Sequence, residues 1–427
     1  MNQLSRRHFL RLAGGIGAAS AVGGWHRKAR AAASARVVVI GAGFGGATCA
    51  RYLRKADPGI AVTIVEPNQR VITCPFSNLV LGGLRTMESI THKYDGLRRE
   101  GIEIVHAHAS AIDPKARTVK LSDGKSLSYD RLVVAPGISF KWKAIEGYGE
   151  RAAQTMPHAW TAGAQTTLLQ KKLQAMKDGG VVIIAAPPNP FRCPPGPYER
   201  ASMIAHYLTQ HKPKSKILIL DAKDQFSKQG LFLDGWSRLY PEMIEWIPVS
   251  KGGGVRAVDA KKMLVETELD AHQADVANII PPQAAGEIAH RAGLTDETGF
   301  CPVDPKTFES KKQPGIHVVG DATIAGTMPK SAFAANSQAK LAAAAIVAAL
   351  RGGELADATF VNTCYSLIGP QYGISIVGVY RIGERGISDV PGAGGVSPRD
   401  ADADFRRNEA KYAEGWYASI TADTWAV

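Results

Sequence analysis

Five cysteines give this chain of 427 residues its clearest capacity for redox chemistry: Cys49, Cys74, Cys193, Cys301 and Cys364. Thiols can pair as disulfides, react as nucleophiles or hold a cofactor, and an odd number requires an explanation. No Cys-x-x-Cys-His sequence occurs, so the chain does not itself attach a c-type haem. Cys74 follows a predicted strand in a loop, where it could be a packing residue, a free thiol or an attachment point.

A glycine motif near the N-terminus has the spacing of a dinucleotide-binding loop. The β-branched run at residues 36–40 predicts a buried parallel strand, and the Ala- and Leu-rich segment that follows the glycines predicts a helix. Between them, Gly41 allows a tight turn, Gly43 leaves room for a pyrophosphate, and Gly46 lets the helix pack closely on the strand. The next predicted strand ends in Glu66, a carboxylate suited to bind a ribose hydroxyl. A glycine turn between core elements would not require that acid, so the pattern favours a dinucleotide site.

Three later segments could complete a flavin site. One predicted strand ends at Ala135 and Gly137, where the backbone would pass the cofactor, and another ends at Gly320 and Asp321, where a ribityl chain would lie. Lys330 precedes an alanine-rich helix that runs to about residue 350. Together with the helix N-terminus, its ammonium would suit the N1/O2 side of a reduced flavin, and the alternative is a solvated lysine at a helix start.

A second α/β unit begins with the predicted strand at residues 179–186. A second glycine motif would follow this strand in a pyridine-nucleotide reductase, but residues 187–195 are rich in proline, which lacks the N–H donors that a pyrophosphate needs. The strand at 216–221 still ends in an acid, Asp221. We therefore expect a Rossmann-like domain without a competent NAD(P) site.

The first 33 residues are predicted to be a twin-arginine signal peptide, carrying Arg6 and Arg7 before a modest apolar stretch. Two Gly-Gly pairs disfavour an ordinary N-terminal helix. The leader holds six basic residues and no acid, so its removal lowers the net charge from +12 to +6. This export route carries folded proteins, and we expect a periplasmic protein that takes up its dinucleotide before export.

Composition excludes several classes of protein. With 45% hydrophobic and 21% charged residues, the chain is typical of a soluble globular protein. No basic stripe interleaved with aromatic residues suggests nucleic acid. The longest strongly apolar run, residues 341–350, is far shorter than the roughly 20 residues of a membrane span, so no integral membrane segment is expected in the mature chain. We also expect no metal site.

The predicted fold class is α/β, with two Rossmann-like domains of the FAD/NAD(P)-binding type and a C-terminal α+β domain. In a final helix, Phe405, Tyr412, Trp416 and Ile420 mark one face, which we assign to packing rather than to cofactor contact. The expected regions are the signal peptide, the FAD domain in two parts on either side of the second Rossmann-like domain, and the C-terminal domain. They span residues 1–33, 34–150, 151–298, 299–350 and 351–427.

Along nearly its whole mature length the chain resembles the flavoprotein subunit of flavocytochrome c sulfide dehydrogenase, a two-dinucleotide-domain flavoprotein of the glutathione-reductase-like type. The matching runs are Thr73-Cys74, Ser77-Asn78, residues 191–200, Gly320-Asp321, residues 328–331 and residues 362–365. The resemblance implies FAD bound through its 8α-methyl group to Cys74 and a redox-active disulfide between Cys193 and Cys364. Cys49 and Cys301 would then be ordinary buried thiols.

The resemblance also implies a mechanism. Hydrogen sulfide would open the disulfide and leave as zero-valent sulfur or polysulfide, while electrons pass through FAD to haem c on a separate cytochrome subunit, forming a heterodimer. Glu199, one helical turn from the cysteine segment, is a candidate proton acceptor, and an equally good alternative is a first-turn acid favoured by the helix dipole. A sulfide:quinone oxidoreductase and a non-catalytic flavin-binding partner in a sulfur-oxidation assembly are the alternative functions.

Overall fold

The glycine motif belongs to a five-stranded sheet with β1 (Arg36–Ile40) at its centre. In this computed structural model, which describes residues 34–427, β1 pairs in parallel with β2 (Ala61–Val65) and β9 (Arg131–Val134). β5 (Glu103–Val105) and β20 (Ile316–Val318) form the two edges. Helices cover the strands, so β1 is an unbroken buried run rather than an alternating one. The strands predicted at the positions of β1 and β2 are confirmed, and β20 shows that the chain returns to this sheet late in the sequence.

Two helices pack against each other beside this sheet, α1 (Phe44–Ala56) and α8 (Ala332–Arg351). Ser331 caps α8 by accepting a hydrogen bond from the Ala334 amide at 3.0 Å. By length and composition α8 could cross a membrane, which differs from our expectation for the mature chain. Half of its most apolar stretch is buried inside the protein, against α1 and β22 (Thr359–Gly369). Its apolar character is therefore accounted for by core packing.

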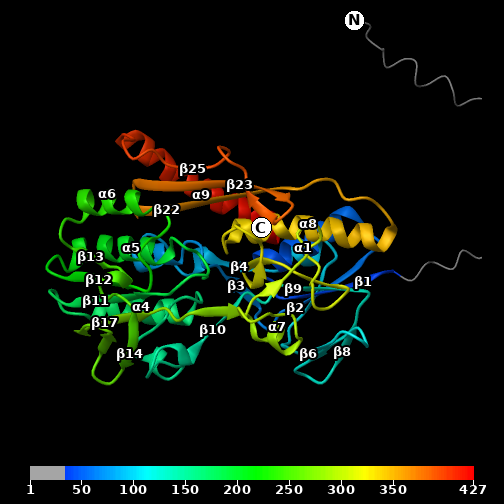
Figure 1. The fold of residues 1–427 in the computed structure, drawn as a ribbon, viewed down its shortest axis with the longest axis horizontal. Helices are drawn as coiled ribbons and strands as arrows, with labels where there is room; N and C mark the ends of the chain where they lie inside the picture. Colours follow the sequence, from blue (N-terminus) through cyan, green and yellow to red (C-terminus); the bar gives the residue numbers. More distant parts are fainter. Residues whose placement is uncertain (1–33) are drawn as a thin grey trace, which may run out of the picture. The chain divides into compact units, whose positions relative to one another are not determined.

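The second parallel sheet lies to the left of the first in Figure 1 and has the order β13-β12-β11-β17. Its strands are β13 (Ile244–Ile247), β12 (Lys216–Asp221), β11 (Val181–Ala186) and β17 (Val276–Ile279). The proline-rich loop after β11 leads directly into α5 (Gly196–His211). These two parallel sheets with their covering helices confirm the α/β class with two Rossmann-like units.

The C-terminal region lies over both sheets, along the top of Figure 1. β22 pairs antiparallel with β23 (Tyr372–Gly383) and contacts α5 in the second unit as well as α8 in the first. The last helix, α9 (Ala403–Trp425), packs on β23, and the indole N–H of Trp425 donates to the carbonyl of Ala42 at 2.9 Å. The end of the chain is thus tied to the glycine loop near its start.

The remaining elements of the described structure lie in the connections around the two sheets and in the C-terminal region. They are β3 (Arg70–Ile72), α2 (Ser77–Leu81), η1 (Glu88–Ile90), β4 (Thr91–Lys93), α3 (Asp95–Arg99), β6 (Ala109–Asp113), β7 (Thr118–Leu121), β8 (Ser126–Ser128), β10 (Ile138–Phe140), η2 (Trp142–Ala144), η3 (Ala152–Gln154), α4 (Ala164–Ala175), α6 (Gln229–Leu239), η4 (Val249–Lys251), β14 (Val255–Asp259), β15 (Leu264–Thr267), β16 (Ala271–Gln273), β18 (Gln283–Ala285), α7 (Glu287–Arg291), β19 (Cys301–Pro302), η5 (Gly320–Ala322), β21 (Thr323–Ile324), β24 (Gly386–Asp389) and β25 (Gly395–Val396).

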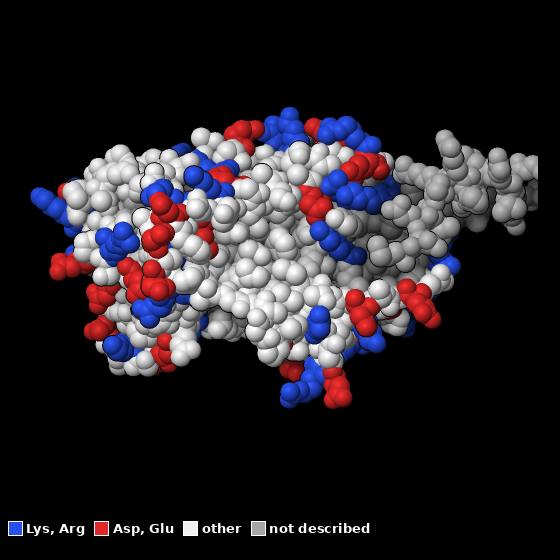
Figure 2. Space-filling model, turned by 90° about the horizontal axis from the view of Figure 1, so that it is seen from above, with Lys and Arg blue, Asp and Glu red and all other residues white. Residues whose placement is uncertain are grey.

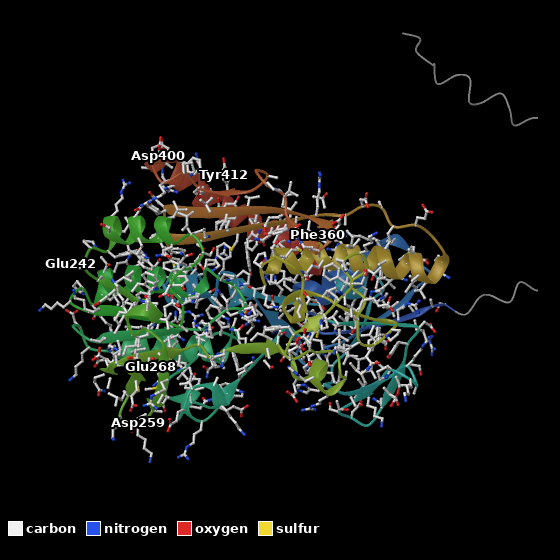
Figure 3. All side chains as sticks on the ribbon, viewed as in Figure 1. Glu242, Asp259, Glu268, Phe360, Asp400 and Tyr412 are labelled. Atoms are coloured by element: carbon white, nitrogen blue, oxygen red, sulfur yellow. The ribbon has the colours of Figure 1, made fainter. Side chains whose placement is uncertain are left out.

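The packing face predicted for the last helix is wrong in part. Tyr412 is 60% exposed and stands on the outer surface in Figure 3, whereas Phe360 of β22 lies in the interior. Phe405 is also exposed, and Ile420 is buried as expected. The helix instead buries Arg406, Glu409, Ala410, Ala413 and Tyr417, and it packs on β23.

The remaining expectations concern the signal peptide, the region boundaries, and Cys49 and Cys301. The predicted signal peptide lies outside the described residues, and the boundaries between the later regions stay a prediction. Cys49 and Cys301 are fully buried, as expected of ordinary packing thiols. Burial raises the pKa of each thiol to about 12, so neither is a reactive thiolate at neutral pH.

Candidate active site

The glycine loop has the close approaches that its sequence predicted. Gly41 has a φ of +95°, and a Cβ there would lie 2.4 Å from the carbonyl oxygen of Ala135. A Cβ on Gly46 would lie 1.9 Å from the carbonyl oxygen of Gly41, so helix and strand pack as closely as only glycine allows. No atom of residues 34–427 lies within 4 Å of the position of a Cβ on Gly43. This open face lies at the N-terminus of α1, where no side chain caps the first N–H groups and an anion can bind.

A cavity of about 850 Å³ begins at this loop and is lined by Gly41, Gly43, Glu66, Ala135 and Gly137, among others. Glu66 is held at the end of β2 because its Oε2 accepts a hydrogen bond from the amide of Ala42 at 3.1 Å. These residues fit the adenosine and pyrophosphate half of a dinucleotide. These five predicted residues therefore line one cavity.

A second cavity shares Gly43, Ala135 and Gly137 with the first and continues from it. Gly320 and Asp321, which follow β20, line this cavity. Asp321 Oδ1 is buried and has no hydrogen-bond partner among the described residues, as expected for an atom that would bind a hydroxyl of a bound group. The two connected cavities, cradle and free carboxylate together fit FAD.

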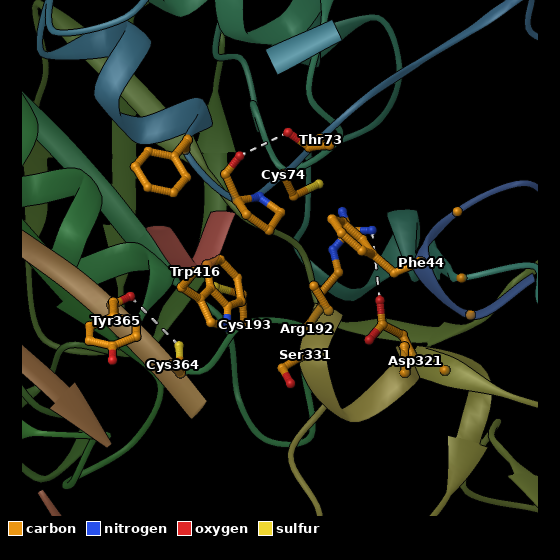
Figure 4. A pocket seen from close by; sticks show the side chains of 18 of the residues that line it. Phe44, Thr73, Cys74, Arg192, Cys193, Asp321, Ser331, Cys364, Tyr365 and Trp416 are labelled. Atoms are coloured by element: carbon orange, nitrogen blue, oxygen red, sulfur yellow. Dashed lines mark hydrogen bonds and ion pairs between the residues drawn. The ribbon is translucent and has the colours of Figure 1, made fainter. Parts of the chain in front are cut away.

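Cys74 lies in the loop between β3 and α2 and lines the second cavity (Figure 4). Its thiol donates a weak hydrogen bond to the Trp160 carbonyl, with a sulfur–oxygen distance of 3.6 Å. The preceding residue, Thr73, is buried and pairs with the hydroxyl of Tyr417 on α9 at 2.7 Å. The loop is therefore fixed with its cysteine at the cavity wall, where a flavin could be attached.

Cys193 lies in the proline-rich loop at the carboxyl end of β11 and lines the same cavity. Its φ is +58°, a conformation that is uncommon for a residue with a side chain. The backbone is held there because the Cys193 amide donates to the Lys330 carbonyl and the Cys193 carbonyl accepts from the Gly196 amide, both at 2.8 Å. This loop thus presents a sulfur where other dinucleotide domains present a phosphate-binding turn.

Cys364 reaches the cavity from β22, a segment far along the sequence from the loop of Cys193 (Figure 4). The two cysteines also line another cavity, so their sulfurs lie between two open spaces. All five cysteines, which lie within residues 34–427, are free thiols in this structure. The disulfide that the resemblance implies between Cys193 and Cys364 is therefore not formed here and stays a prediction.

Glu199 lines the cavity from the first turn of α5. Its Oε2 accepts a hydrogen bond from Asn78 Nδ2 at 2.8 Å, and its Oε1 accepts one from the Leu367 amide at 2.9 Å. Burial raises the pKa of this carboxyl, against the smaller opposite effect of these bonds and of Lys228 and Arg200. A carboxyl with a raised pKa beside two thiols is suited to take up and release a proton.

The structure does not support the role predicted for Lys330. Its ammonium donates to the backbone carbonyls of Asp321 at 2.8 Å and Thr323 at 2.7 Å and lies 3.8 Å from the ring centre of Phe300. Among the described residues that line the flavin-sized cavity, Ser331 is present and Lys330 is not. Burial lowers the pKa of its ammonium to about 8. Backbone carbonyls bind the Lys330 ammonium, so it is not free to face a flavin. Lys330 contributes to the site through its backbone carbonyl, which accepts the hydrogen bond from the Cys193 amide.

Sequence reasoning missed two residues of the cavity wall. Arg192 lies between Cys74 and Asp321, with 4.0 Å between its Nη1 and Asp321 Oδ2 (Figure 4). Its place beside Cys193 in the proline-rich motif could have indicated it. Trp416 lines the cavity from α9, although its helix face was assigned to packing, and its indole N–H is buried without a partner among the described residues. No spacing rule distinguishes such a tryptophan from a core residue.

The acid at the end of β12 is not free to bind a ribose. Asp221 is fully buried, and its Oδ2 accepts from the Tyr198 hydroxyl at 2.6 Å and from the Trp246 indole N–H at 2.9 Å. Its other oxygen is paired with Lys223 at 2.6 Å. The protein itself therefore uses the groups that a nicotinamide dinucleotide would need in this second unit.

Comparison with known proteins gives three family matches. Residues 166–281 match the central region of the sulfide dehydrogenase (flavocytochrome c) flavoprotein chain, residues 356–425 match the flavin-binding region of flavocytochrome c sulphide dehydrogenase, and residues 35–184 match pyridine nucleotide-disulphide oxidoreductases. The matched segments include Cys193 in the first of these regions and Cys364 in the second.

Individual relatives agree with these matches. A sulfide dehydrogenase flavoprotein chain from Chlorobaculum thiosulfatiphilum is 67% identical over 45 residues, which cover 94% of that sequence and 10% of this chain. Mitochondrial sulfide:quinone oxidoreductase from Mus musculus is 24% identical over 317 residues, covering 70% of this chain and 67% of the relative. The crystal structure of the sulfide:quinone oxidoreductase from Aquifex aeolicus has a TM-score of 0.72 at 22% identity, covering 92% of this chain and 93% of that one, and confirms the fold. The chain belongs to the family of the flavoprotein chain of flavocytochrome c sulfide dehydrogenase.

Proposed function

We propose that this protein is an FAD-dependent sulfide dehydrogenase that oxidises hydrogen sulfide to zero-valent sulfur through a Cys193–Cys364 redox disulfide. One observation supports the proposal above all others: two cysteines from distant segments line the same flavin-sized cavity, which continues from a dinucleotide cradle. Two thiols side by side can store two electrons as a dithiol and release them as a disulfide.

The chemistry balances in three steps. Hydrosulfide attacks one sulfur of the disulfide, so that a new S–S bond forms, the old one breaks, and the other cysteine leaves as a thiolate. A second hydrosulfide takes the outer sulfur of the persulfide as HSS⁻ and leaves a thiol. Re-formation of the Cys193–Cys364 bond then releases one proton and two electrons. FAD, when bound, supplies the acceptor for this electron pair.

Glu199 is suited to take the proton that the thiol loses. It lines the cavity together with both cysteines, and its two hydrogen bonds hold the carboxylate in place. Its raised pKa lets it hold that proton briefly before release to water. The other cavity that Cys193 and Cys364 both line gives sulfide an approach that does not compete with a flavin for space.

We propose a c-type cytochrome subunit as the electron acceptor. The saturated Asp221 and the prolines after β11 argue against a nicotinamide nucleotide. The face of the C-terminal region in Figure 2 carries charges of both signs around its edge and few in its middle, and Val396, Phe405 and Tyr412 are exposed in this region. Such a surface suits a protein partner. The likeness to sulfide:quinone oxidoreductases makes a quinone the second candidate acceptor.

Stopped-flow spectroscopy tests these assignments in order. Sulfide alone should bleach the flavin absorbance, and the reduced protein should reoxidise rapidly with a c-type cytochrome and very slowly with NAD⁺. Rapid reoxidation by a short-chain ubiquinone but not by cytochrome would assign the protein as a sulfide:quinone oxidoreductase. Absence of bleaching by sulfide in protein that dithionite reduces normally would leave only a non-catalytic flavin-binding role.

Export to the periplasm by the twin-arginine route is part of the same proposal, and residues 1–33 carry it through Arg6 and Arg7. An Arg6→Lys/Arg7→Lys double variant should keep bound flavin in the cytoplasmic fraction. Equal periplasmic yields of this variant and the original chain would contradict the assignment.

A further inference from the structure

A buried lysine beside the cysteine pair has no carboxylate of its own. Lys228 precedes α6 and is only 7% exposed, yet among the described residues it forms no ion pair. Its neighbour along the same loop, Lys223, is paired with Asp221 at 2.6 Å. A buried ammonium is costly unless an anion or several hydrogen bonds compensate its lost hydration, so the position of Lys228 requires a reason.

The ammonium is aimed at the strand that carries Cys364. Its Nζ donates to the carbonyl of Cys364 at 3.2 Å and to the Ser366 hydroxyl at 2.9 Å. Ser366 is itself buried, and the ring centre of Phe232 lies 5.9 Å from Nζ on another side. These neutral contacts fix the position of the charge next to Cys364 without neutralising it.

The surrounding charges make the two cysteines unequal. Lys228 lowers the pKa of Cys364, against the larger effect of burial and the smaller effect of Glu199, which both raise it. For Cys193, burial, Cys364, Glu199 and Cys74 all raise the pKa, and only Arg192 lowers it. Glu199 and Glu409 also face Lys228 and raise the pKa of its ammonium, but burial has the larger effect and lowers that pKa. Both carboxylates bind other groups: Glu199 accepts from Asn78 and the Leu367 amide, and Glu409 accepts from the hydroxyls of Ser375 and Ser397. Negative charge is therefore better accommodated on Cys364 than on Cys193.

We propose that Lys228 is a positioning residue whose buried ammonium stabilises the anionic sulfur of Cys364 when the Cys193–Cys364 pair is reduced. The inference rests on the proposed function, because only an open pair presents an anion there. In each turnover Lys228 would then gain the counter-charge that it lacks in the resting protein. A purely structural role, tying the start of α6 to β22, would need only its hydrogen bonds.

Alkylation of the reduced holoenzyme by iodoacetamide measures this directly, since only the thiolate reacts. The extent of reaction at Cys364 is followed from pH 5 to pH 10 by peptide mass spectrometry. In Lys228→Met and Lys228→Gln the midpoint should move upward by about one to three pH units, the usual effect of losing a nearby opposite charge. The reaction rate at pH 7 should fall about tenfold or more. Lys228→Arg should keep the original midpoint.

The glutamine variant separates charge from hydrogen bonding, because a neutral amide can still donate to Cys364 and Ser366. Lys212 provides a matched control at the far end of α5, where its buried ammonium donates to the carbonyls of Gln174 and Met176. Lys212→Gln should leave the Cys364 midpoint unchanged. If Lys228→Met does not retain FAD, the comparison of the Gln and Arg variants decides.

An unchanged midpoint in Lys228→Gln, or an equal shift in Lys212→Gln, would overturn the proposal. Alkylation needs no sulfide, so this outcome is distinguishable from failure of the proposed function. Loss of sulfide-driven bleaching in the original protein would contradict the function and leave the alkylation result standing.

Discussion

Replacement of Glu199 by glutamine should abolish a proton transfer while leaving the cavity intact. Glu199 accepts from Asn78 Nδ2 and from the Leu367 amide. A glutamine can keep the bond to Leu367, but its Nε2 would face Asn78 Nδ2, and donor would meet donor. Asn78 cannot turn over to correct this, because its Oδ1 already accepts from Arg200 Nε at 3.0 Å. The variant therefore loses one buried hydrogen bond, which costs about 1–3 kcal/mol of unfolding free energy at most.

The raised pKa of Glu199 decides whether the rate of flavin reduction rises or falls with pH. Burial raises the pKa of Glu199 above its ordinary value of 4.5, so the carboxylate becomes available as a base only at higher pH. The rate of sulfide-driven flavin reduction should rise with pH through that pKa in the original protein and lose this rise in Glu199→Gln. For stability the sign is opposite: the folded carboxyl holds its proton more tightly than the unfolded one, so its favourable contribution fades as pH rises.

Stopped-flow bleaching at several pH values and thermal unfolding are the assays. Loss of a positioned general base typically slows a step by about 10²–10⁴-fold, and FAD content should be unchanged. Glu268→Gln is the control, since Glu268 is exposed and lies far from the cavity (Figure 3). A Glu199→Gln protein that retains FAD and bleaches at the original rate, with the original pH profile, would refute the assignment and leave Glu199 as a first-turn acid of α5.

Three further predictions concern the cofactor, the thiols and the C-terminal helix. Acid-precipitated protein should keep its yellow colour, and Cys74→Ser should lose the flavin on precipitation while retaining it in the native state; colourless precipitate from the original protein would exclude covalent attachment. Cys193→Ser and Cys364→Ser should each abolish bleaching by sulfide but not by dithionite, and wild-type rates in either would contradict the redox pair. Trp425→Phe removes the hydrogen bond to Ala42 and should lower the unfolding free energy by about 1–3 kcal/mol in denaturant titrations, together with FAD retention. Trp142→Phe, in a partly exposed 3-10 turn, should change neither quantity.

Local sequence signals predicted much of the fold because they are read within a few residues. The buried strands at 36–40, 61–65 and 216–221 are continuous apolar runs, and burial on both faces of a parallel sheet leaves no room for polar alternation. The roles of Gly41, Gly43 and Gly46 were predicted in the same way, from the backbone geometry that a tight turn and a close approach require. The length of the apolar segment in α8 was underestimated, because alanine contributes little hydrophobicity to an apolar run. The small alanine side chains nevertheless allow α8 to pack closely on α1.

The face of α9 and the direction of Lys330 could not be predicted, because both depend on partners far away in the sequence. Tyr412 is exposed and Trp416 lines the cavity because β23 packs against the neighbouring small residues of the helix. Lys330 turns to the carbonyls of Asp321 and Thr323, which local spacing could not weigh against a cofactor. A hydrogen bond to a fixed carbonyl needs tertiary placement of both groups.

The sequence by itself determined the dinucleotide cradle at Gly41, Gly43 and Gly46, with Glu66 at the end of the next strand, since these roles follow from backbone freedom and strand order alone. Only the tertiary structure decided that Cys193 and Cys364 line one cavity with Glu199 and that Lys228 lies beside them. Segments separated by well over a hundred residues are brought together here because β22 packs across α5 and α8. No local sequence pattern encodes contacts between residues so far apart in the chain.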